Sequence, residues 1–171
     1  MSKKLGKADY REIENLYKKF EKLDELQIYE FYEAAAKELA ARLLSLVIPR
    51  TPVGDYSGLV EPYNEKQGGT LRRGWTGGKE TTAQSYAQSL NVSKVGQSYN
   101  IEIINPVDYA TYVEYGHRQQ PGRYVPALGK QLKAGWVEGQ FMLTISVDEL
   151  RQATPKILEK KINTLFKDVF G

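Results

Sequence analysis

The feature that most constrains the fold is a long helical pattern that ends abruptly at two prolines. From Glu25 to Ile48, apolar residues recur every three or four positions, at Ile28, Tyr32, Ala35, Leu39, Leu43 and Leu46. This spacing places them on one face of an α-helix about 36 Å long. Pro49 lacks an amide hydrogen and is not expected inside a helix, and Pro52 and Gly54 then favour turns. The sequence therefore predicts one long helix that buries its apolar face against the rest of the chain.

Two further helical patterns lie near the ends of the chain. Residues 8–24 carry an amphipathic pattern with Asp9 in the position of an N-cap, and its apolar residues are Ile13, Leu16, Tyr17, Phe20 and Leu23. Thr154 and Pro155 have the features of a helix start, and Leu158, Ile162, Leu165 and Val169 would share one face after them. Before this helix, Ser146 and Glu149 resemble a capping box. The preceding segment 128–145 fits a helix that turns into an extended stretch.

The middle of the chain favours strands. Short runs bounded by Gly, Asn and Ser occur at 71–76, 89–95 and 99–104, and the four residues Val95–Ser98 suit a hairpin turn. The run 109–115 fits either a strand or a helix. At least three antiparallel strands are expected. The predicted fold class is therefore α+β, a small antiparallel sheet packed against an N-terminal long helix and a C-terminal helix.

The length of 171 residues suits one hydrophobic core. We expect a flexible start at 1–8 and a single domain at 9–171, with a long exposed loop at 51–69 that is rich in Gly, Pro, Asp and Asn. The basic first residues are followed by charged ones, which does not fit a signal peptide. The most apolar run, 34–48, is interrupted by charges and does not fit a membrane span.

The sequence offers little catalytic chemistry. His117 is the only histidine, and no cysteine is present. No nucleophile elbow, calcium loop or phosphate-binding loop accompanies His117. We therefore expect no catalytic residues, no metal and no cofactor, and we interpret His117 as a surface or hinge residue. A hydrolase centred on it is the least favoured hypothesis.

A nucleic-acid-binding module is the alternative function. Arg72 and Arg73 stand next to Trp75, whose ring could stack on a base, and the last predicted helix carries lysines. On the predicted strand, however, the two arginines would point to opposite faces. A structural interpretation, with one arginine solvated and the other paired with an acidic neighbour, is favoured. The net charge of +3 permits nucleic-acid binding without arguing for it.

Tyrosine is unusually frequent, with twelve residues against five phenylalanines. Tyrosine rings pack and form hydrogen bonds at once, which is typical of interfaces. Tyr109, Tyr112 and Tyr115 recur every three residues and would form a stripe on a helix. Packing at the edge of this domain's core and an interface role are equally compatible with this pattern.

Several motifs in a fixed order carry a resemblance to a known family. The long helix ends in Pro-Arg-Thr-Pro-Val at 49–53, and Gly-Thr-Leu-Arg-Arg-Gly-Trp follows at 69–75. After the alternating hairpin come Asn-Pro-Val-Asp-Tyr-Ala at 105–110, Tyr-Val-Glu-Tyr-Gly-His at 112–117 and Trp-Val-Glu-Gly-Gln-Phe-Met-Leu at 136–143. Over residues 10–170 this order resembles the minor tail-component family of long-tailed bacteriophages and prophages.

The resemblance implies a structural virion protein of the neck or tail, which completes the tail or joins head to tail through protein–protein contacts. Implied partners are a tail terminator, connector or tail tube and, in the assembled particle, further copies in a ring. The implied location is the virion, after synthesis in the bacterial host cytoplasm. Candidate interaction residues are Arg72, Arg73, Trp75, Tyr109, Tyr112, Glu114, Tyr115, His117 and Arg118.

Overall fold

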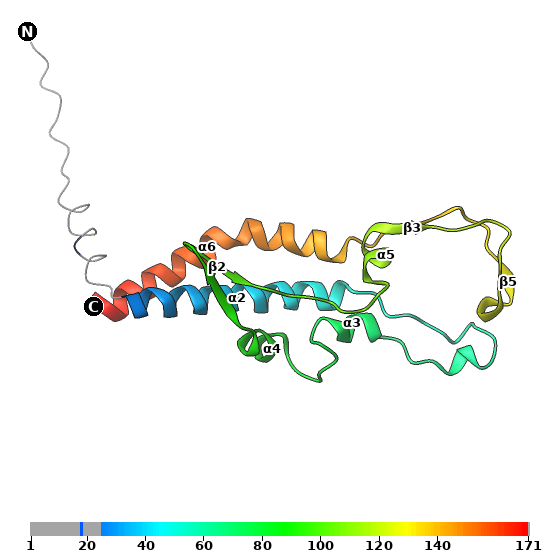
Figure 1. The fold of residues 1–171 in the computed structure, drawn as a ribbon, viewed down its shortest axis with the longest axis horizontal. Coiled ribbons are helices and arrows are strands. Elements are labelled where there is room, and N and C mark those ends of the chain that lie inside the picture. The colour runs from blue at the N-terminus through cyan, green and yellow to red at the C-terminus, as the bar shows by residue number, and fades with distance from the viewer. Residues whose placement is uncertain (1–17, 19–24, 171) are drawn as a thin grey trace, which may run out of the picture.

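Two long helices form the frame of the molecule. A computed structural model describes residues 18 and 25–170 of the chain. Helix α2 (Glu25–Arg50) and helix α6 (Met142–Phe170) run side by side, the shorter elements pack along them, and two irregular segments extend beyond one end (Figure 1). The helix predicted at 8–24 and the flexible start expected at 1–8 lie outside the described residues, except for Lys18.

The prediction of the long helix is confirmed, and its end differs slightly. Helix α2 continues two residues beyond the expected end and contains Pro49 in its last turn. The amide of Thr51 donates to the carbonyl of Val47 over 3.0 Å, and the Thr51 hydroxyl donates to the same oxygen over 2.7 Å. These two bonds close the last turn around the proline, which has no amide hydrogen of its own to contribute.

The predicted start of the last helix is wrong. Helix α6 begins at Met142, twelve residues before Thr154, so Ser146 and Glu149 lie inside the helix and form no capping box. The Ser146 hydroxyl donates to the carbonyl of Met142 over 2.6 Å. Pro155 also lies within α6, and the helix bends along its length (Figure 1), as expected where a proline removes one backbone hydrogen bond.

The predicted hairpin is confirmed, although its strands are shorter than expected. Strand β1 (Val92–Val95) pairs antiparallel with β2 (Ser98–Ile101), and Val95 lies opposite Ser98. Gly96 occupies the turn with a φ of 61°, a conformation that favours glycine. The expected strand at 71–76 is wrong, because Thr70–Gly74 forms the short helix α3. Residues Ala83–Ser89 form helix α4, so the expected strand at 89–95 begins only at β1.

The fold class is α+β, as predicted, but the strands do not form one sheet. Within the described residues, β3 (Gly116–Arg118) pairs with β6 (Trp136–Glu138), and β4 (Tyr124–Val125) pairs with β5 (Lys130–Gln131). Together with the hairpin these make three separate two-stranded sheets. The segment 128–145 therefore contains short strands followed by the start of α6, the reverse of the predicted order.

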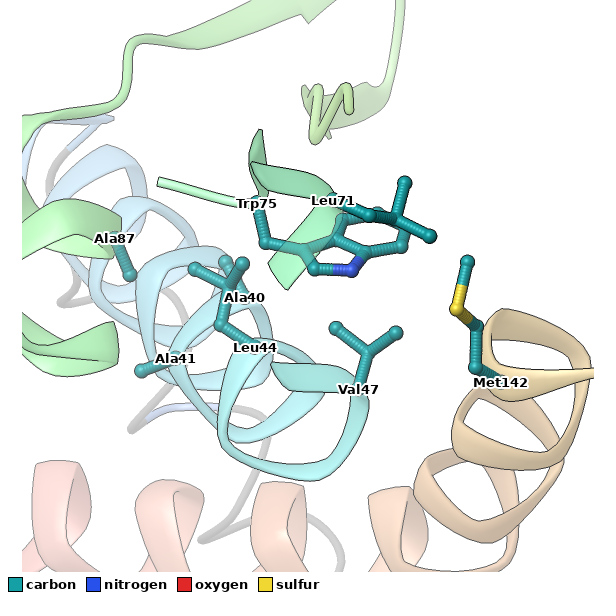
Figure 2. Close-up of a cluster of buried hydrophobic side chains, with 8 residues drawn as sticks. All are labelled: Ala40, Ala41, Leu44, Val47, Leu71, Trp75, Ala87 and Met142. Atoms are coloured by element: carbon teal, nitrogen blue, oxygen red, sulfur yellow. The ribbon is translucent and has the colours of Figure 1, made fainter. Parts of the chain in front are cut away.

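The hydrophobic core lies around the second half of α2. Its buried residues come from α2, the α3 region, α4 and α6, and they are Ala40, Ala41, Leu44, Val47, Leu71, Trp75, Ala87 and Met142 (Figure 2). Alanines fill the contact between α2 and α4, which lets the two backbones approach closely. Leu44 is fully buried, whereas Leu26 on the same helix is 63% exposed. The core therefore stabilises the end of α2 that precedes Thr51.

Replacing Leu44 should test this distribution. Leu44→Ala is expected to lower the free energy of unfolding by about 2–5 kcal/mol, because it removes buried methyl groups and leaves a cavity. Leu26→Ala is the matched control and should change it by less than about 0.5 kcal/mol. Urea unfolding followed by circular dichroism measures both, and equal losses would contradict the assigned core.

Two sets of ion pairs link the long helices. The Glu38 carboxylate of α2 contacts Lys161 of α6 and Arg42 of its own helix, each over 2.8 Å. Nearer the other end of α2, Arg50 contacts Glu149 of α6 and donates to the Ser146 hydroxyl over 3.1 Å. The hydrogen bond from Lys161 is the main cause that holds the pKa of Glu38 below its ordinary value of 4.5, and Arg42 adds to it.

The lowered pKa of Glu38 predicts a pH-dependent contribution to stability. A carboxyl whose pKa is lower in the folded state stabilises the fold above its unfolded pKa and loses this effect as the pH falls through the folded pKa. Glu38→Gln should therefore be less stable than the parent at about pH 7, and the difference should shrink at about pH 3. Urea unfolding at both pH values measures this, with Glu159→Gln as the exposed control. A difference that does not depend on pH would contradict the prediction.

Candidate interaction surface

Thr51 joins the end of α2 to α3. It is fully buried, and its hydroxyl accepts a hydrogen bond of 2.7 Å from the indole Nε1 of Trp75. Its carbonyl accepts from Nε and one terminal nitrogen of Arg72, over 3.0 and 2.7 Å. Because the carbonyls in the last turn of a helix lack partners in that helix, the Arg72 guanidinium acts as a cap for α2. The motifs at 49–53 and 69–75 thus meet in one buried contact.

The placement of Arg72, Arg73 and Trp75 differs from the sequence interpretation. Trp75 is buried, so its ring is not presented to a nucleic acid or a protein partner. Arg73 is exposed and donates to the carbonyl of Gly68 over 3.2 Å. Both guanidinium groups therefore bind backbone carbonyls, whereas pairing of one with an acidic side chain was expected. The expected strand geometry does not apply either, since both residues lie on α3.

Asn105 attaches the middle of the chain to α3. Its side-chain amide donates to the carbonyl of Leu71 over 2.8 Å, and its side-chain oxygen accepts from the amide of Val107 over 3.2 Å. A Cβ at Gly74 would lie only 2.2 Å from that oxygen, so the position requires glycine. The motifs at 69–75 and 105–110 are therefore structural partners.

Glu114 fixes the start of α6. It lies on helix α5 (Ala110–Tyr115) and is only 4% exposed. One carboxylate oxygen accepts from the amide of Leu143 over 2.8 Å, and the other accepts from the amide and hydroxyl of Thr144 over 2.9 and 2.7 Å. A carboxylate at a helix N-terminus satisfies free amides and is favoured by the helix dipole. Glu114 was a candidate interaction residue, but both of its carboxylate oxygens bind the start of α6 and are not available to a partner.

The backbones around Glu114 approach closely through glycines. A Cβ at Gly116 would lie 2.4 Å from the carbonyl of Val137, and one at Gly139 would lie 2.3 Å from the carbonyl of Glu114. Gly116 also has a φ of 80°, which favours glycine. The Phe141 amide then donates to the Glu114 carbonyl over 3.0 Å. The motifs at 112–117 and 136–143 therefore form a second junction.

Exposed aromatic side chains surround this second junction. The sequence of residues 109–115 fitted either a strand or a helix, and in the structure they form helix α5 with Tyr109 at its N-cap. The tyrosines at 109, 112 and 115 therefore follow helical spacing. Tyr112 and Tyr115 are 58% and 59% exposed. Trp136, 46% exposed, lies beside Gly116. We call the side chains of Tyr109, Tyr112, Tyr115 and Trp136 the aromatic surface.

His117 and Arg118 border the aromatic surface on β3. The His117 ring lies 5.7 Å from the Tyr112 ring, and its Nδ1 is buried with no hydrogen-bond partner among the described residues. Arg118 is exposed and lies opposite Trp136 in the β3–β6 pair. Trp136 was not among the candidate interaction residues from the sequence, because its segment was interpreted as part of a helix.

In residues 18 and 25–170, no group of three His, Asp or Glu side chains lies close enough to hold a metal ion. None of the described helices is both long and apolar enough to cross a membrane.

Most of the residues at these junctions lie within a match to a known family. Residues 14–116 match the model of the family described as "Bacteriophage HK97-gp10, putative tail-component". The chain belongs to this family. It is therefore a tail-related structural protein of a bacteriophage, which places it in the virion and among other tail proteins. No curated protein and no solved structure matches the chain significantly.

The family match includes the whole first junction but only the α5 side of the second. It extends from before α2 to the first residue of β3, so it includes Thr51, Arg72, Trp75, Asn105 and Glu114. The resemblance inferred from sequence ran further, over residues 10–170. Trp136 and α6 lie beyond the match, although they contact matched residues.

Glu114 should be essential for the position of α6. Glu114→Gln keeps one acceptor oxygen and removes the charge, and we expect a loss of about 1–3 kcal/mol in the free energy of unfolding. Glu138→Gln, at an exposed position of β6, is the matched control and should have little effect. Urea unfolding measures both variants, and a neutral Glu114→Gln would show that the carboxylate does not cap α6.

Proposed function

We propose that this chain completes the phage tail or joins it to the head, with the aromatic surface as a contact for another virion protein. The observation that carries the proposal is the exposure of Tyr112, Tyr115 and Trp136 next to a rigid junction. Exposed aromatic rings on a rigid support are typical of residues that contribute most to binding. Membership of a tail-component family supports a virion protein as the partner.

We favour α5 over the loop at 51–69 as the main contact with a partner protein because α5 is rigidly held. Helix α5 is held by Glu114 on one side and by the close approach of Gly116 to Val137 on the other. The backbone that carries its tyrosines therefore loses little conformational freedom on binding, which leaves more of the contact energy for affinity. The loop at 51–69 is mostly exposed and contains one short 3₁₀ helix, Tyr63–Glu65. We assign it a secondary, partner-specific contact.

The proposed partners are a tail terminator, a connector or the tail tube, together with further copies of this chain in a ring. An elongated subunit with different surfaces at its two ends suits a head-to-tail interface, which closes into a ring when the rotation between copies permits. No catalytic step is part of this proposal, and the chain would act by contact alone. Synthesis takes place in the host cytoplasm before assembly.

Nucleic-acid binding receives less support from the same residues. Trp75 is buried against Thr51, and Arg72 is occupied by the carbonyls of Thr51 and Pro49. On α6, Lys161 is paired with Glu38. Of the three residues that motivated the alternative, Arg72 and Trp75 serve the fold, and the exposed Arg73 binds the Gly68 carbonyl.

Removing the tyrosine rings should separate assembly from folding. In a phage that lacks this gene, the parent chain supplied in trans should restore infectious particles, whereas Tyr112→Ala/Tyr115→Ala should leave heads and tails unjoined in electron micrographs. The thermal unfolding temperature of the double variant should stay close to that of the parent, because both rings are exposed. Ile104→Ala, at a site 57% exposed, is the control and should restore assembly. Normal particles with the double variant would contradict the proposal.

A further inference from the structure

The segment 118–136, which we call the arm, carries the excess positive charge of the chain. It contains Arg118, Arg123, Lys130 and Lys133 and no aspartate or glutamate. The net charge of the whole chain is only +3, so the residues outside the arm are together slightly negative. The arm is one of the two segments that extend beyond the helical frame (Figure 1). Positive charge is therefore concentrated on a part of the molecule that projects from the frame.

The cations of the arm are free of acidic partners. All four side chains are exposed, and none forms an ion pair with a carboxylate of residues 18 or 25–170. On the frame, by contrast, Lys161 and Arg50 are paired with carboxylates, and Arg72 binds backbone carbonyls. Unpaired charges of one sign in one segment attract a partner of the opposite sign. The arm is therefore suited to a polyanion.

The backbone of the arm is a two-stranded antiparallel ribbon. Strand β3 pairs with β6 at its base, and β4 pairs with β5 further out (Figure 1). Between these pairs, the Gln119 amide donates to the carbonyl of Gly135 over 2.9 Å, which continues the pairing beyond β3. The major groove of B-DNA is about 12 Å wide and admits a two-stranded ribbon. The shape of the arm thus matches the groove of a duplex.

The four cations are divided between the two strands of the ribbon. The first strand carries both arginines and the second carries both lysines. The Leu132 amide donates to the carbonyl of Arg123 over 2.9 Å, so Arg123 and Lys133 stand at nearly the same level. A ribbon in a groove has one phosphate backbone beside each strand, and cations on both strands then meet phosphates. Lys130 and Lys133 are three positions apart, which places them on opposite faces of an extended strand. A flat acidic protein surface would meet only one of these faces.

We propose that the arm is a binding site for duplex DNA. Its four cations contact phosphates, and Tyr124 and Gln131, which lie opposite each other in the β4–β5 pair, face the base edges. Tyr124 is 58% exposed, and a glutamine amide offers both a donor and an acceptor to a base edge. This site shares no residue with the arginines and tryptophan of α3 and its C-cap, and it does not depend on the proposed joining role.

Carboxylates near the arm limit its affinity for DNA. The loop at 51–69 carries Asp55, Glu61 and Glu65, and its Val60 amide donates to the carbonyl of Ala127 in the arm over 3.1 Å. These carboxylates repel phosphates that approach the tip of the arm. Binding is therefore expected to be moderate and to depend strongly on salt.

Fluorescence anisotropy of a labelled duplex of about 20 base pairs tests the site with the full chain. The parent should bind, and a plot of log affinity against log salt concentration should have a slope of about −3 to −4, because about four phosphates are neutralised. Arg118→Gln/Arg123→Gln/Lys130→Gln/Lys133→Gln should bind about tenfold more weakly or worse, with a much flatter slope. The matched control is Lys79→Gln/Lys156→Gln/Lys160→Gln/Lys167→Gln, which removes four exposed cations elsewhere and should keep a slope close to that of the parent.

Three outcomes of this experiment would overturn the proposal. The first is the absence of binding by the parent at about 50 mM salt, and the second is an equal loss of affinity in the two fourfold variants. In the third, poly-L-glutamate competes as strongly as unlabelled duplex at equal total charge, which would indicate an acidic protein surface as the partner.

Single substitutions on the two strands test whether both strands contact phosphates, and they do not rely on the folding of the fourfold variant. Arg123→Gln and Lys133→Gln should each reduce the steepness of the salt slope by about 1. Their thermal unfolding temperatures should match that of the parent, because both side chains are exposed. An unchanged slope in either variant would show that the ribbon does not lie between two phosphate backbones and would overturn the proposal.

Discussion

The fold depends on how the end of α2 is held, and Thr51 holds it. Its backbone amide and hydroxyl close the last turn of α2, while its hydroxyl also binds Trp75 and its carbonyl binds Arg72. All of these groups are polar and lie at or near the core, where an unpaired hydrogen-bonding group is costly. The contact therefore specifies one position of α3 on α2. Asn105 then positions the following segment on α3.

A second contact of the same kind positions α6. The Glu114 carboxylate receives the free amides of Leu143 and Thr144, and the glycines at 116 and 139 allow the backbones to meet. The motifs by which the sequence resembles a phage tail-component family are largely the residues of these two contacts. They maintain the fold, and the exposed tyrosines between them carry the proposed contact with a partner.

Sequence reasoning succeeded where one local pattern decided the structure. The apolar spacing of α2 and the turn of the β1–β2 hairpin are local, and both were predicted correctly. The α3 segment looked like a strand, but Arg72 and Trp75 find their partners in Thr51, which precedes them by about twenty positions. The start of α6 was missed because its cap is Glu114, far away in sequence. The stripe of tyrosines at 109, 112 and 115 was predicted from their spacing. The exposure of Trp136 and the burial of Glu114 depend on contacts between segments far apart in the sequence, so local patterns could not predict them.

The bond between Glu114 and α6 has a mechanical consequence. Helix α6 has 29 residues, and a helix of this length extends over about 43 Å. A force applied to the tyrosines of α5 passes through the Glu114 carboxylate into the first turn of this rod. Pro155 is its most compliant point, because one backbone hydrogen bond is missing there. The Glu114 carboxylate thus joins the tyrosine-bearing helix α5 to a helix that extends to the opposite end of the molecule (Figure 1).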